Sequence, residues 1–261
     1  MVMKIENYKS PASTFTFPNN PQAFDDDINA NYTTTLIDYQ RHHILVSGGG
    51  VAPKQIILTG NFFGTNKNTN YRTLSGHFLE NIKLKKLYFD SDRFYLGVGK
   101  AIKKTHSGGR TNFLDYVATF ETIVGILLSD TQRTHTDGAA EVTNAGNVTT
   151  FIEEIKGTVN SGASNIVITD TIGINQITIP ATSLTTGQEV IVTFVKMVDS
   201  GDGVYVSEYN YTTVAGTQIK TVKTTDGFGI IQLGANRTTA GIGVTNLDAG
   251  YTIKFRDGYS S

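Results

Sequence analysis

Three strand-like stretches decide the fold of this chain: Gln55-Ile-Ile-Leu-Thr-Gly-Asn-Phe-Phe-Gly64, Lys86-Leu-Tyr-Phe-Asp-Ser-Asp-Arg-Phe-Tyr-Leu-Gly-Val-Gly99 and Phe113-Leu-Asp-Tyr-Val-Ala-Thr-Phe-Glu121. β-Branched and aromatic residues dominate each stretch, and the turn formers Asp90-Ser-Asp-Arg93 divide the second one into the two strands of a hairpin. The region from Gln55 to Asp130 therefore predicts the order strand, helix, hairpin, strand, and its sequence contains no catalytic constellation.

One helix is predicted between the first two stretches, from about Asn70 to Ile82. Its apolar residues Tyr71, Leu74 and Phe78 follow the spacing of three to four residues that places side chains on one helical face. We therefore expect one side of this helix to be buried.

The composition is typical of many short strands joined by tight turns. The 261 residues include 27 Gly, 12 Tyr and 14 Phe, and 17% are charged, which is below the quarter that is usual for a globular protein. The chain length suits one large domain or two ordinary domains. Because there is no Cys, disulfides, thiolate metal sites and Cys nucleophiles are excluded.

The net charge of −1 argues against a general nucleic-acid-binding surface, so no sequence-specific nucleic acid is expected as a partner. Residues 1–130 carry 14 Lys and Arg against 11 Asp and Glu, a net charge of +3, whereas residues 131–261 carry 8 against 12, a net charge of −4. The difference supports two domains, 1–130 and 131–261, with a linker rich in Thr, Asn, Ala and Gly from Thr131 to Val148.

Strand patterns recur at short intervals after this linker, with turn residues between them and no segment of helical period. The predicted strands are Phe151–Val159, Asn165–Thr169, Gln176–Ile179, Glu189–Val198, Val204–Tyr211, Ile219–Val222, Gly229–Leu233, Gly241–Thr245 and Tyr251–Arg256. This many short strands predicts a β-sandwich or a barrel for the second half.

In the order and residue patterns of its strands and helix, the first half resembles the ring domain of phage distal tail proteins, the family often called Dit. The pieces that carry the resemblance are the strand end Leu58-Thr-Gly60, the helix near Leu74 and Leu79, the hairpin end Tyr95-Leu-Gly97 and the strand Asp115-Tyr-Val-Ala-Thr-Phe-Glu121. The first ~40 residues match the family poorly.

The second half resembles the C-terminal sandwich of the same family. The similar pieces are Asn144-Ala-Gly-Asn-Val148, Ile155-Lys-Gly157, Thr186-Gly-Gln188, Leu233-Gly-Ala-Asn236 and Tyr251-Thr-Ile-Lys-Phe-Arg-Asp-Gly-Tyr259. The chain is short for the family, which leaves no room for additional receptor-binding insertions.

The resemblance implies a mainly β fold, with an N-terminal split β-barrel-like ring domain that has one short helix. The C-terminal β-sandwich would be similar to galectin-like or carbohydrate-binding modules. The implied function is that of a structural virion protein and not of an enzyme: a hexameric ring that joins the tail tube to the tail tip or baseplate hub. Because rings leave strand edges for their neighbours, we expect an edge strand within residues 35–121 to pair across subunits.

The implied partners are further copies of the chain, the tail tube protein, and the tail hub or tail-spike protein. A receptor-binding protein or a host surface saccharide is a further implied partner, at the periphery of the tail tip. The implied location is the tail tip of the virion, after synthesis in the host cytoplasm. No signal peptide is expected at Met1, and no stretch approaches the roughly 18 apolar residues of a membrane span.

No metal or cofactor site is predicted. The histidines are His42, His43, His77, His106 and His135, and no pair among them has the spacing of metal ligands. We expect Asp25-Asp-Asp27 to be a solvated loop, Asp199-Ser-Gly-Asp-Gly203 to be a hairpin turn, and Ser47-Gly-Gly-Gly50 to be a loop that binds no phosphate.

Two candidate contact surfaces follow from the sequence. Tyr205, Tyr209 and Tyr211 share one strand face at i, i+4 and i+6, where a sugar ring would stack. The second surface is a ring-docking rim of basic residues: Lys83, Lys85, Lys86, Lys100, Lys103 and Lys104.

Two alternatives to the tail adaptor stay open. One is a carbohydrate-binding adhesin that acts in host recognition through its C-terminal β-sandwich. The other is a related tube or tail-completion protein with the same ring fold, which its position along the tail would distinguish.

Overall fold

The computed structural model covers the chain and describes most of it. The described residues are 3–8, 13–24, 30–36, 43–51, 54–79, 83–105, 112–170, 176–193, 196–197, 203–204, 210–215, 218–223, 226–227 and 231–260. The statements below concern these residues.

The fold is mainly β, as predicted, with one α-helix, α1 (Lys67–Leu79), among the described residues. The strands up to the middle of the chain are β1 (Lys4–Asn7), β2 (Thr14–Thr16), β3 (Gln22–Phe24), β4 (Ala30–Leu36), β5 (His43–Val51), β6 (Gln55–Phe63), β7 (Lys85–Tyr88), β8 (Arg93–Thr105) and β9 (Phe113–Thr136). The hairpin predicted around Asp90–Arg93 is confirmed as β7 and β8, in which Tyr88 pairs with Phe94.

The second half consists of short strands and two 3₁₀ turns, η1 (Ala181–Ser183) and η2 (Thr239–Gly241). Its strands are β10 (Thr150–Thr158), β11 (Ile166–Thr169), β12 (Gln176–Ile179), β13 (Glu189–Thr193), β14 (Lys196–Met197), β15 (Gly203–Val204), β16 (Asn210–Ala215), β17 (Gln218–Lys223), β18 (Asp226–Gly227), β19 (Gln232–Leu233), β20 (Gly243–Val244) and β21 (Thr252–Tyr259).

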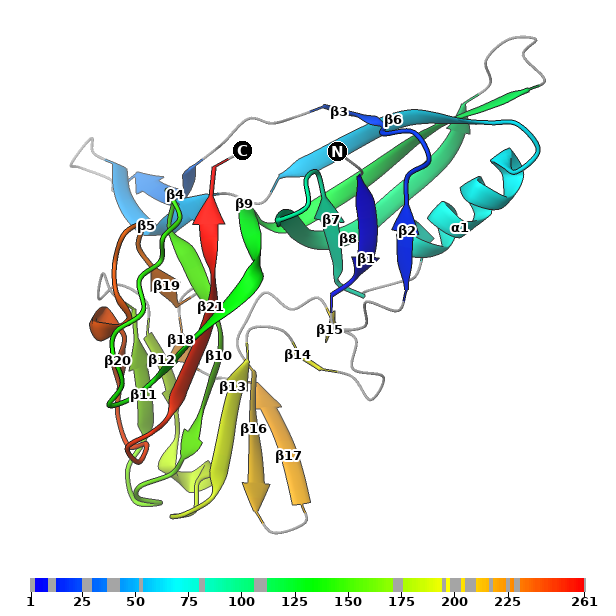
Figure 1. The fold of residues 1–261 in the computed structure, drawn as a ribbon. Helices are drawn as coiled ribbons and strands as arrows, with labels where there is room; N and C mark the ends of the chain where they lie inside the picture. Colours follow the sequence, from blue (N-terminus) through cyan, green and yellow to red (C-terminus); the bar gives the residue numbers. More distant parts are fainter. Residues whose placement is uncertain are drawn as a thin grey trace.

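One antiparallel sheet runs through both halves in the order β17-β16-β13-β10-β21-β9-β8-β7-β1-β2, with β6 on β9, β3 on β6 and β19 on β10. Figure 1 shows β6, β8 and β9 extending together to one side above α1, while the C-terminal strands form a block below them. We call the extension made by residues 54–79, 93–105 and 112–121 the arm.

The 24-residue strand β9 is the hub of this sheet. Its first half lies between β6 and β8, and its second half pairs with β21 up to Thr136. The predicted linker is therefore wrong over residues 131–136, which continue strand β9 from Asp130. The alternating polar residues there belong to a paired strand, and composition alone did not distinguish it from a linker.

Two hydrophobic cores lie along β9. The first core packs buried residues of the arm against β1, β2 and β7, and the second core packs the C-terminal strands against residues such as Tyr88, Phe94 and Leu96. Leu87 belongs to the first core and its neighbour Tyr88 to the second, because successive strand residues point to opposite faces.

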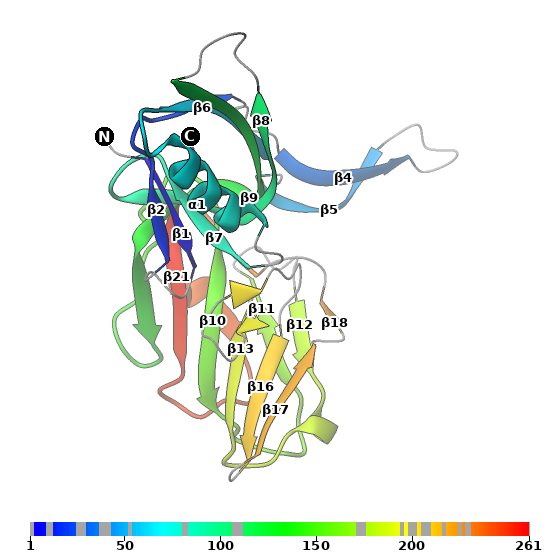
Figure 2. The same ribbon diagram turned by 90° about the vertical axis from the view of Figure 1, so that its right-hand side faces the viewer.

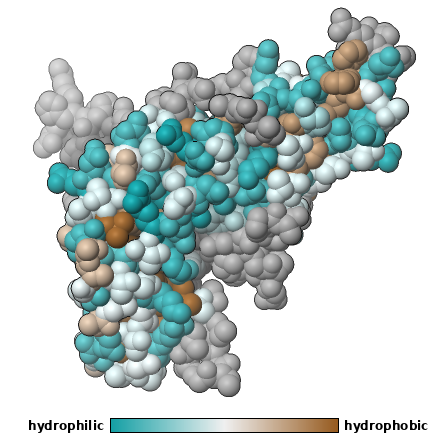
Figure 3. Space-filling view, in the orientation of Figure 1, coloured by the Kyte–Doolittle hydropathy of each residue, from teal (hydrophilic) through white to brown (hydrophobic). Residues whose placement is uncertain are grey.

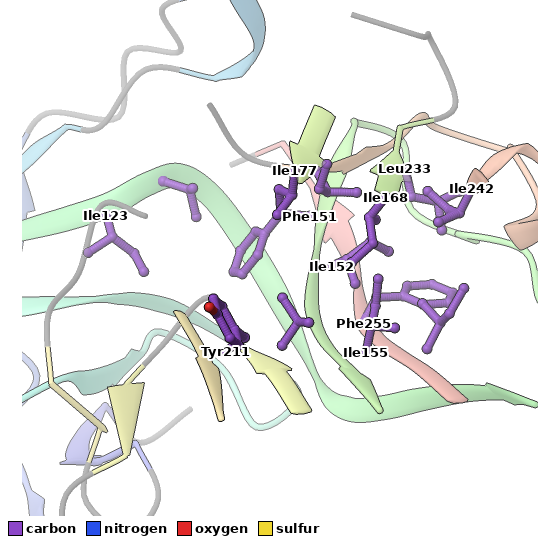
Figure 4. Packing of buried hydrophobic residues seen from close by; sticks show 14 of the residues in the cluster. Ile123, Phe151, Ile152, Ile155, Ile168, Ile177, Tyr211, Leu233, Ile242 and Phe255 are labelled. Atoms are coloured by element: carbon purple, nitrogen blue, oxygen red, sulfur yellow. The ribbon is translucent and has the colours of Figure 1, made fainter. Parts of the chain in front are cut away.

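In the second half, a four-stranded sheet, β18-β12-β11-β20, faces the large sheet across the second core. Ile168 of β11 and Ile177 of β12 belong to this core together with Ile152 and Ile155 of β10 (Figure 4). The alternation of buried and half-buried residues in β11 and β12 is the pattern of a sheet with one packed face.

The helix α1 begins and ends about three residues before the predicted range, and it covers one face of the arm. Leu74 and Phe78 are buried in the first core, as the spacing predicted. Gly99 of β8 permits this packing, because a Cβ placed there would lie 2.6 Å from the Phe78 Cα atom.

Ser47-Gly-Gly-Gly50 is not a loop but part of β5, where it pairs with β4. The absence of side chains on glycine weakens a strand but leaves its backbone hydrogen bonds intact, so the prediction of a loop was wrong. The loop predicted at Asp25–Asp27 and the turn predicted around Asp199 and Asp202 lie outside the described residues.

Arg256 of β21 holds the bend where β9 leaves the arm. Gln132 pairs with Arg256 and Leu128 pairs with Gly258. Between these two pairs β9 has more residues than β21, which forms a bulge in β9. The Arg256 guanidinium donates to the backbone carbonyls of Ser129 and Asp130 in this bulge, and its Nε lies 3.0 Å from Glu153 Oε1.

Candidate assembly surfaces

An exposed aromatic pair lies at the far end of the arm. Phe63 of β6 and Phe113 of β9 face each other across the ladder, with ring centroids 6.3 Å apart and exposed fractions of 59% and 42%. Their neighbours Phe62 and Leu114 are buried, because successive residues of a strand point to opposite faces. Figure 3 shows hydrophobic surface gathered at this end of the molecule. Two adjacent aromatic side chains left in water favour a contact with another surface.

The sequence reasoning missed this pair, although the sequence contains a signal for it. Two consecutive aromatic residues on one strand, Phe62 and Phe63, cannot both point into the same core. One of them must lie on the opposite face, and in the arm that face is only partly buried at Val117 and Thr119.

The hairpin of β4 and β5 pairs with no other strand among the described residues. Figure 2 shows it projecting sideways from the body of the molecule, away from the C-terminal sheets. A single two-stranded hairpin is marginally stable in water by itself, and both of its outer edges carry backbone groups that hydrogen-bond readily to another strand. The hairpin is therefore a candidate for strand pairing with a second chain.

The predicted lysine rim is wrong for two of its members. Lys85 is completely buried and donates to Asn7 Oδ1, and Lys86 is buried with its Nζ 2.9 Å from Asp130 Oδ1. Both belong to β7, which lies between β1 and β8, and their amino groups bond to side chains of Asn7 in β1 and Asp130 in β9. Lys83, just before β7, is partly buried.

The other three lysines of that set are exposed along β8. Lys100 forms an ion pair with Glu121 at 2.6 Å, and Lys104 lies over the Tyr71 ring with its Nζ 5.5 Å from the ring centroid. Lys103 is exposed on the opposite face of the strand from Lys104. These residues give the arm a positive surface on both faces but do not form a single rim.

The predicted saccharide surface is wrong at Tyr211, which is 1% exposed and packs in the second core (Figure 4). Strand β16 lies inside the large sheet between β13 and β17, and this face of it is covered by the core. Tyr205 and Tyr209 lie outside the described residues.

The described histidines give no metal site. His77 and His135 are buried, and within the described ranges no group of three His, Asp or Glu residues is arranged to hold a metal ion. His43 belongs to β5, whereas His42 and His106 lie outside the described residues. Among the described helices, none has the length and apolar character needed to cross a membrane.

One open cavity of about 440 Å³ lies where the start of β2 meets α1, lined by Ser13, Thr73, Gly76 and His77. Its described lining offers two hydroxyls and one imidazole. No carboxylate, lysine or arginine belongs to this described lining.

Comparison with known proteins adds a likeness of the whole chain. One chain in the structure of the phage p2 baseplate in its activated conformation with Sr is 12% identical, with 97% of both chains covered and a TM-score of 0.50. The corresponding baseplate structure with Ca gives 12% identity, 97% coverage of both chains and a TM-score of 0.49. The SPP1 Dit (gp 19.1) protein gives 13% identity, 99% coverage of both chains and a TM-score of 0.41.

No family model matches the chain, and no curated protein matches it. The likeness to the chain from the strontium-containing p2 baseplate structure is a likeness of fold. It extends over both halves of the present chain. The predicted resemblance to a phage tail-tip component is thus confirmed at the level of the fold.

Proposed function

We propose that this chain is a structural protein of a phage tail tip, of the distal tail class. Six copies form a ring through residues 1–130, and residues 131–261 project outward as a second domain. The ring joins the tail tube to the tail hub or tail-spike protein. The mechanism is assembly, and the protein performs no catalytic step.

The observation that carries the proposal is the fold shared with a baseplate chain over 97% of both sequences, at a TM-score of 0.50. At this coverage the match spans both halves of the chain and their junction. A partial match to one sheet would be common to many β proteins, whereas a match across two halves and their junction is more specific.

The unpaired hairpin supports the ring. A head-to-tail interface that closes by rotation needs two different surfaces on each subunit. The β4–β5 hairpin supplies one of them, because neither of its outer edges pairs with another strand within the described ranges. The arm supplies the other, with its aromatic pair and its incompletely covered face. We infer that the hairpin of one subunit pairs with a strand edge of the next.

The exposed lysines Lys100, Lys103 and Lys104 support contacts with an acidic neighbouring protein above or below the ring. Such surface charges contribute mainly to the rate and orientation of docking and little to affinity. The identity of that neighbour as tail tube or hub follows from the proposed position. A receptor-binding protein or host saccharide would be bound, if at all, by the outward domain.

Hydrogen exchange tests the strand pairing. Backbone amides of residues 30–36 and 43–51 should exchange rapidly in dilute protein and become protected when rings form. A matched variant replaces residues 31–50 by a Gly-Ser linker; it should keep the melting temperature of the parent protein and lose ring formation. Rings that still form in this variant would contradict pairing through the hairpin.

The alternative of a carbohydrate-binding adhesin has no specific support among the described residues, because Tyr211 is buried. Binding of glycans by the isolated full-length chain, without rings, would be its signature.

A further inference from the structure

A lysine and an asparagine meet inside the N-terminal sheet. Asn7 of β1 and Lys85 of β7 are directly opposite residues of an antiparallel ladder, and the Lys85 amine donates to Asn7 Oδ1. Lys85 has no exposed surface, and Asn7 is 4% exposed. Lysine is rarely enclosed so completely unless its amine has a partner. We call Asn7 and Lys85 the amine–amide pair.

The surroundings of the amine–amide pair are apolar. Ile5 and Leu87 are the opposite residues two positions along the same two strands, so they lie on the same face as the pair. Both belong to the first core and have no exposed surface. Tyr95 of β8, which pairs with Leu87, is 1% exposed. The amine and the amide therefore meet where water is excluded.

The ladder brings the amine to the amide. Opposite residues of an antiparallel pair have Cβ atoms about 4.5–5.5 Å apart, a gap that a lysine stem spans. The hydrogen bond to Oδ1 places the Lys85 Nζ atom beside Asn7 Cγ, the carbon that carries this oxygen. Strand β7 lies between β1 and β8, and β1 lies between β2 and β7, so pairing on both sides holds each strand in register. Two reacting groups fixed in this way lose little further freedom on reaction.

The other buried lysines of the described residues contact groups of different chemistry. Lys54 Nζ lies 2.8 Å from the Tyr95 hydroxyl, and Lys86 Nζ lies 2.9 Å from Asp130 Oδ1. A phenol has no carbonyl carbon, and an ionised carboxylate resists attack by a nucleophile. The primary amide of Asn7 differs from both, because its Cγ atom accepts a nucleophile and its nitrogen leaves as ammonia.

We propose that Lys85 and Asn7 join in an isopeptide bond within the folded chain. A lysine amine that is desolvated in an apolar surrounding acts as a nucleophile. Lys85 Nζ forms a bond to Asn7 Cγ, the bond between Cγ and Nδ2 breaks, and one proton passes from Nζ to Nδ2. The products are a secondary amide and one molecule of ammonia, and the reaction needs no oxidant or other reactant.

The ammonia has a route to solvent. The Asn7 backbone N–H donates to the Ser13 carbonyl at 3.2 Å, and Ser13 lines the open cavity of about 440 Å³ between β2 and α1. Ammonia is about the size of a water molecule, which a cavity of this volume holds easily. The leaving group therefore departs one strand away from Asn7 without unfolding of the core.

The bond ties the beginning of the chain to the sheet. Strand β1 has four residues and lies near the chain end, where strands fray unless they are held. A covalent link from residue 7 to residue 85 closes a long loop and restricts the unfolded chain, as a disulfide does, in a sequence that has no Cys. This inference does not depend on the proposed function.

The intact mass of the purified full-length chain tests the proposal. Loss of one ammonia should leave the protein about 17 Da lighter than its sequence. Trypsin should release a branched peptide that joins residues 5–9 to residues 84–86, because trypsin does not cleave after a modified Lys85. The full sequence mass would overturn the proposal, and so would a lighter protein without the branched peptide.

Matched variants locate the bond. Lys85→Arg removes the nucleophile and Asn7→Ala removes the electrophile, so both should have the full sequence mass. Lys54→Arg changes another buried lysine and should keep the loss of about 17 Da. The same loss in Lys85→Arg or in Asn7→Ala would overturn the assignment.

Gel electrophoresis supplies a readout that does not depend on whether a variant folds. After boiling in SDS, the parent chain should keep a closed loop between residues 7 and 85 and should migrate faster than Lys85→Arg and Asn7→Ala. Equal migration of the three denatured chains would overturn the isopeptide bond.

Discussion

Phe63 and Phe113 are the last cross-strand pair of the β6–β9 ladder, and both rings remain in water although the next residue inward on each strand is buried. Strand alternation explains the difference, since Phe62 and Leu114 take the face that α1 covers. The exposed pair stabilises the monomer little and favours a contact with another surface.

Replacing Phe63 and Phe113 together by Ser should change the unfolding free energy of the monomer by less than about 1 kcal/mol, because neither side chain fills a core. Ring assembly should be lost. Size-exclusion chromatography with light scattering checks the assembly, and urea unfolding checks the stability. Leu79→Ser is the control, as another exposed apolar residue, at the end of α1. Intact rings in the double variant would show that the arm tip is not an interface.

Arg256→Met should lower the unfolding free energy by about 3 kcal/mol, because it leaves the buried Glu153 carboxylate without its cation. The carbonyls of Ser129 and Asp130 lose their donor as well. Urea unfolding monitored by tyrosine fluorescence measures the change. The matched control Lys254→Met removes the half-buried pair with Glu154 and should cost less than about 1 kcal/mol. Equal losses in the two variants would contradict the role given to Arg256 in the bend.

Asn144 organises the loop before β10 from a completely buried position. Its side-chain amide donates to the carbonyls of Val148, Leu233 and Gly234, and its oxygen accepts from the N–H groups of Gly146 and Gly258. This explains why Asn begins the segment Asn144–Val148.

Asn144→Asp should therefore destabilise the chain by about 2 to 3 kcal/mol, since a carboxylate cannot donate to these carbonyls. Thermal unfolding gives the loss. Asn147 is exposed and hydrogen-bonds to Ser260, so Asn147→Asp should change stability by less than about 0.5 kcal/mol. A loss of similar size at both positions would argue against a specific role for Asn144.

The lowered pKa of Asp130 predicts a contribution to the unfolding free energy that is lost in acid. Its pKa is lowered in the folded chain, so the folded state binds its proton less readily than the unfolded state does. The contribution is present above the usual pKa of 3.8 and is lost as the pH falls through the lower folded value. Asp130→Asn should therefore show a smaller decrease in unfolding free energy between pH 5 and pH 3 than the parent protein. Asp92→Asn, at an exposed turn, should follow the parent curve; a parent-like curve in Asp130→Asn would refute the assignment.

The sequence predicts best where the signal is local. The turn formers Asp90–Arg93 predicted the β7–β8 hairpin, and the spacing of Leu74 and Phe78 predicted the buried face of α1. In the second half, the β12 range Gln176–Ile179 matches the predicted range. These features depend on residues a few positions apart.

The errors arise where distant strands decide the outcome. Lys85 and Lys86 are buried because β1 packs beside β7, and β1 lies far away in the sequence. Tyr211 is buried because its face of β16 packs in the second core, whose other members come from distant strands. Residues 131–136 form a strand and not a linker because β21, near the chain end, pairs with this part of β9.

The most direct test of the account is the native mass of the purified full-length chain, with negative-stain images of the same sample. The account predicts six copies of 28.3 kDa, about 170 kDa, with six-fold ring views. A closed two-fold dimer, or a monomer at every concentration even with purified tube and hub proteins present, would contradict it.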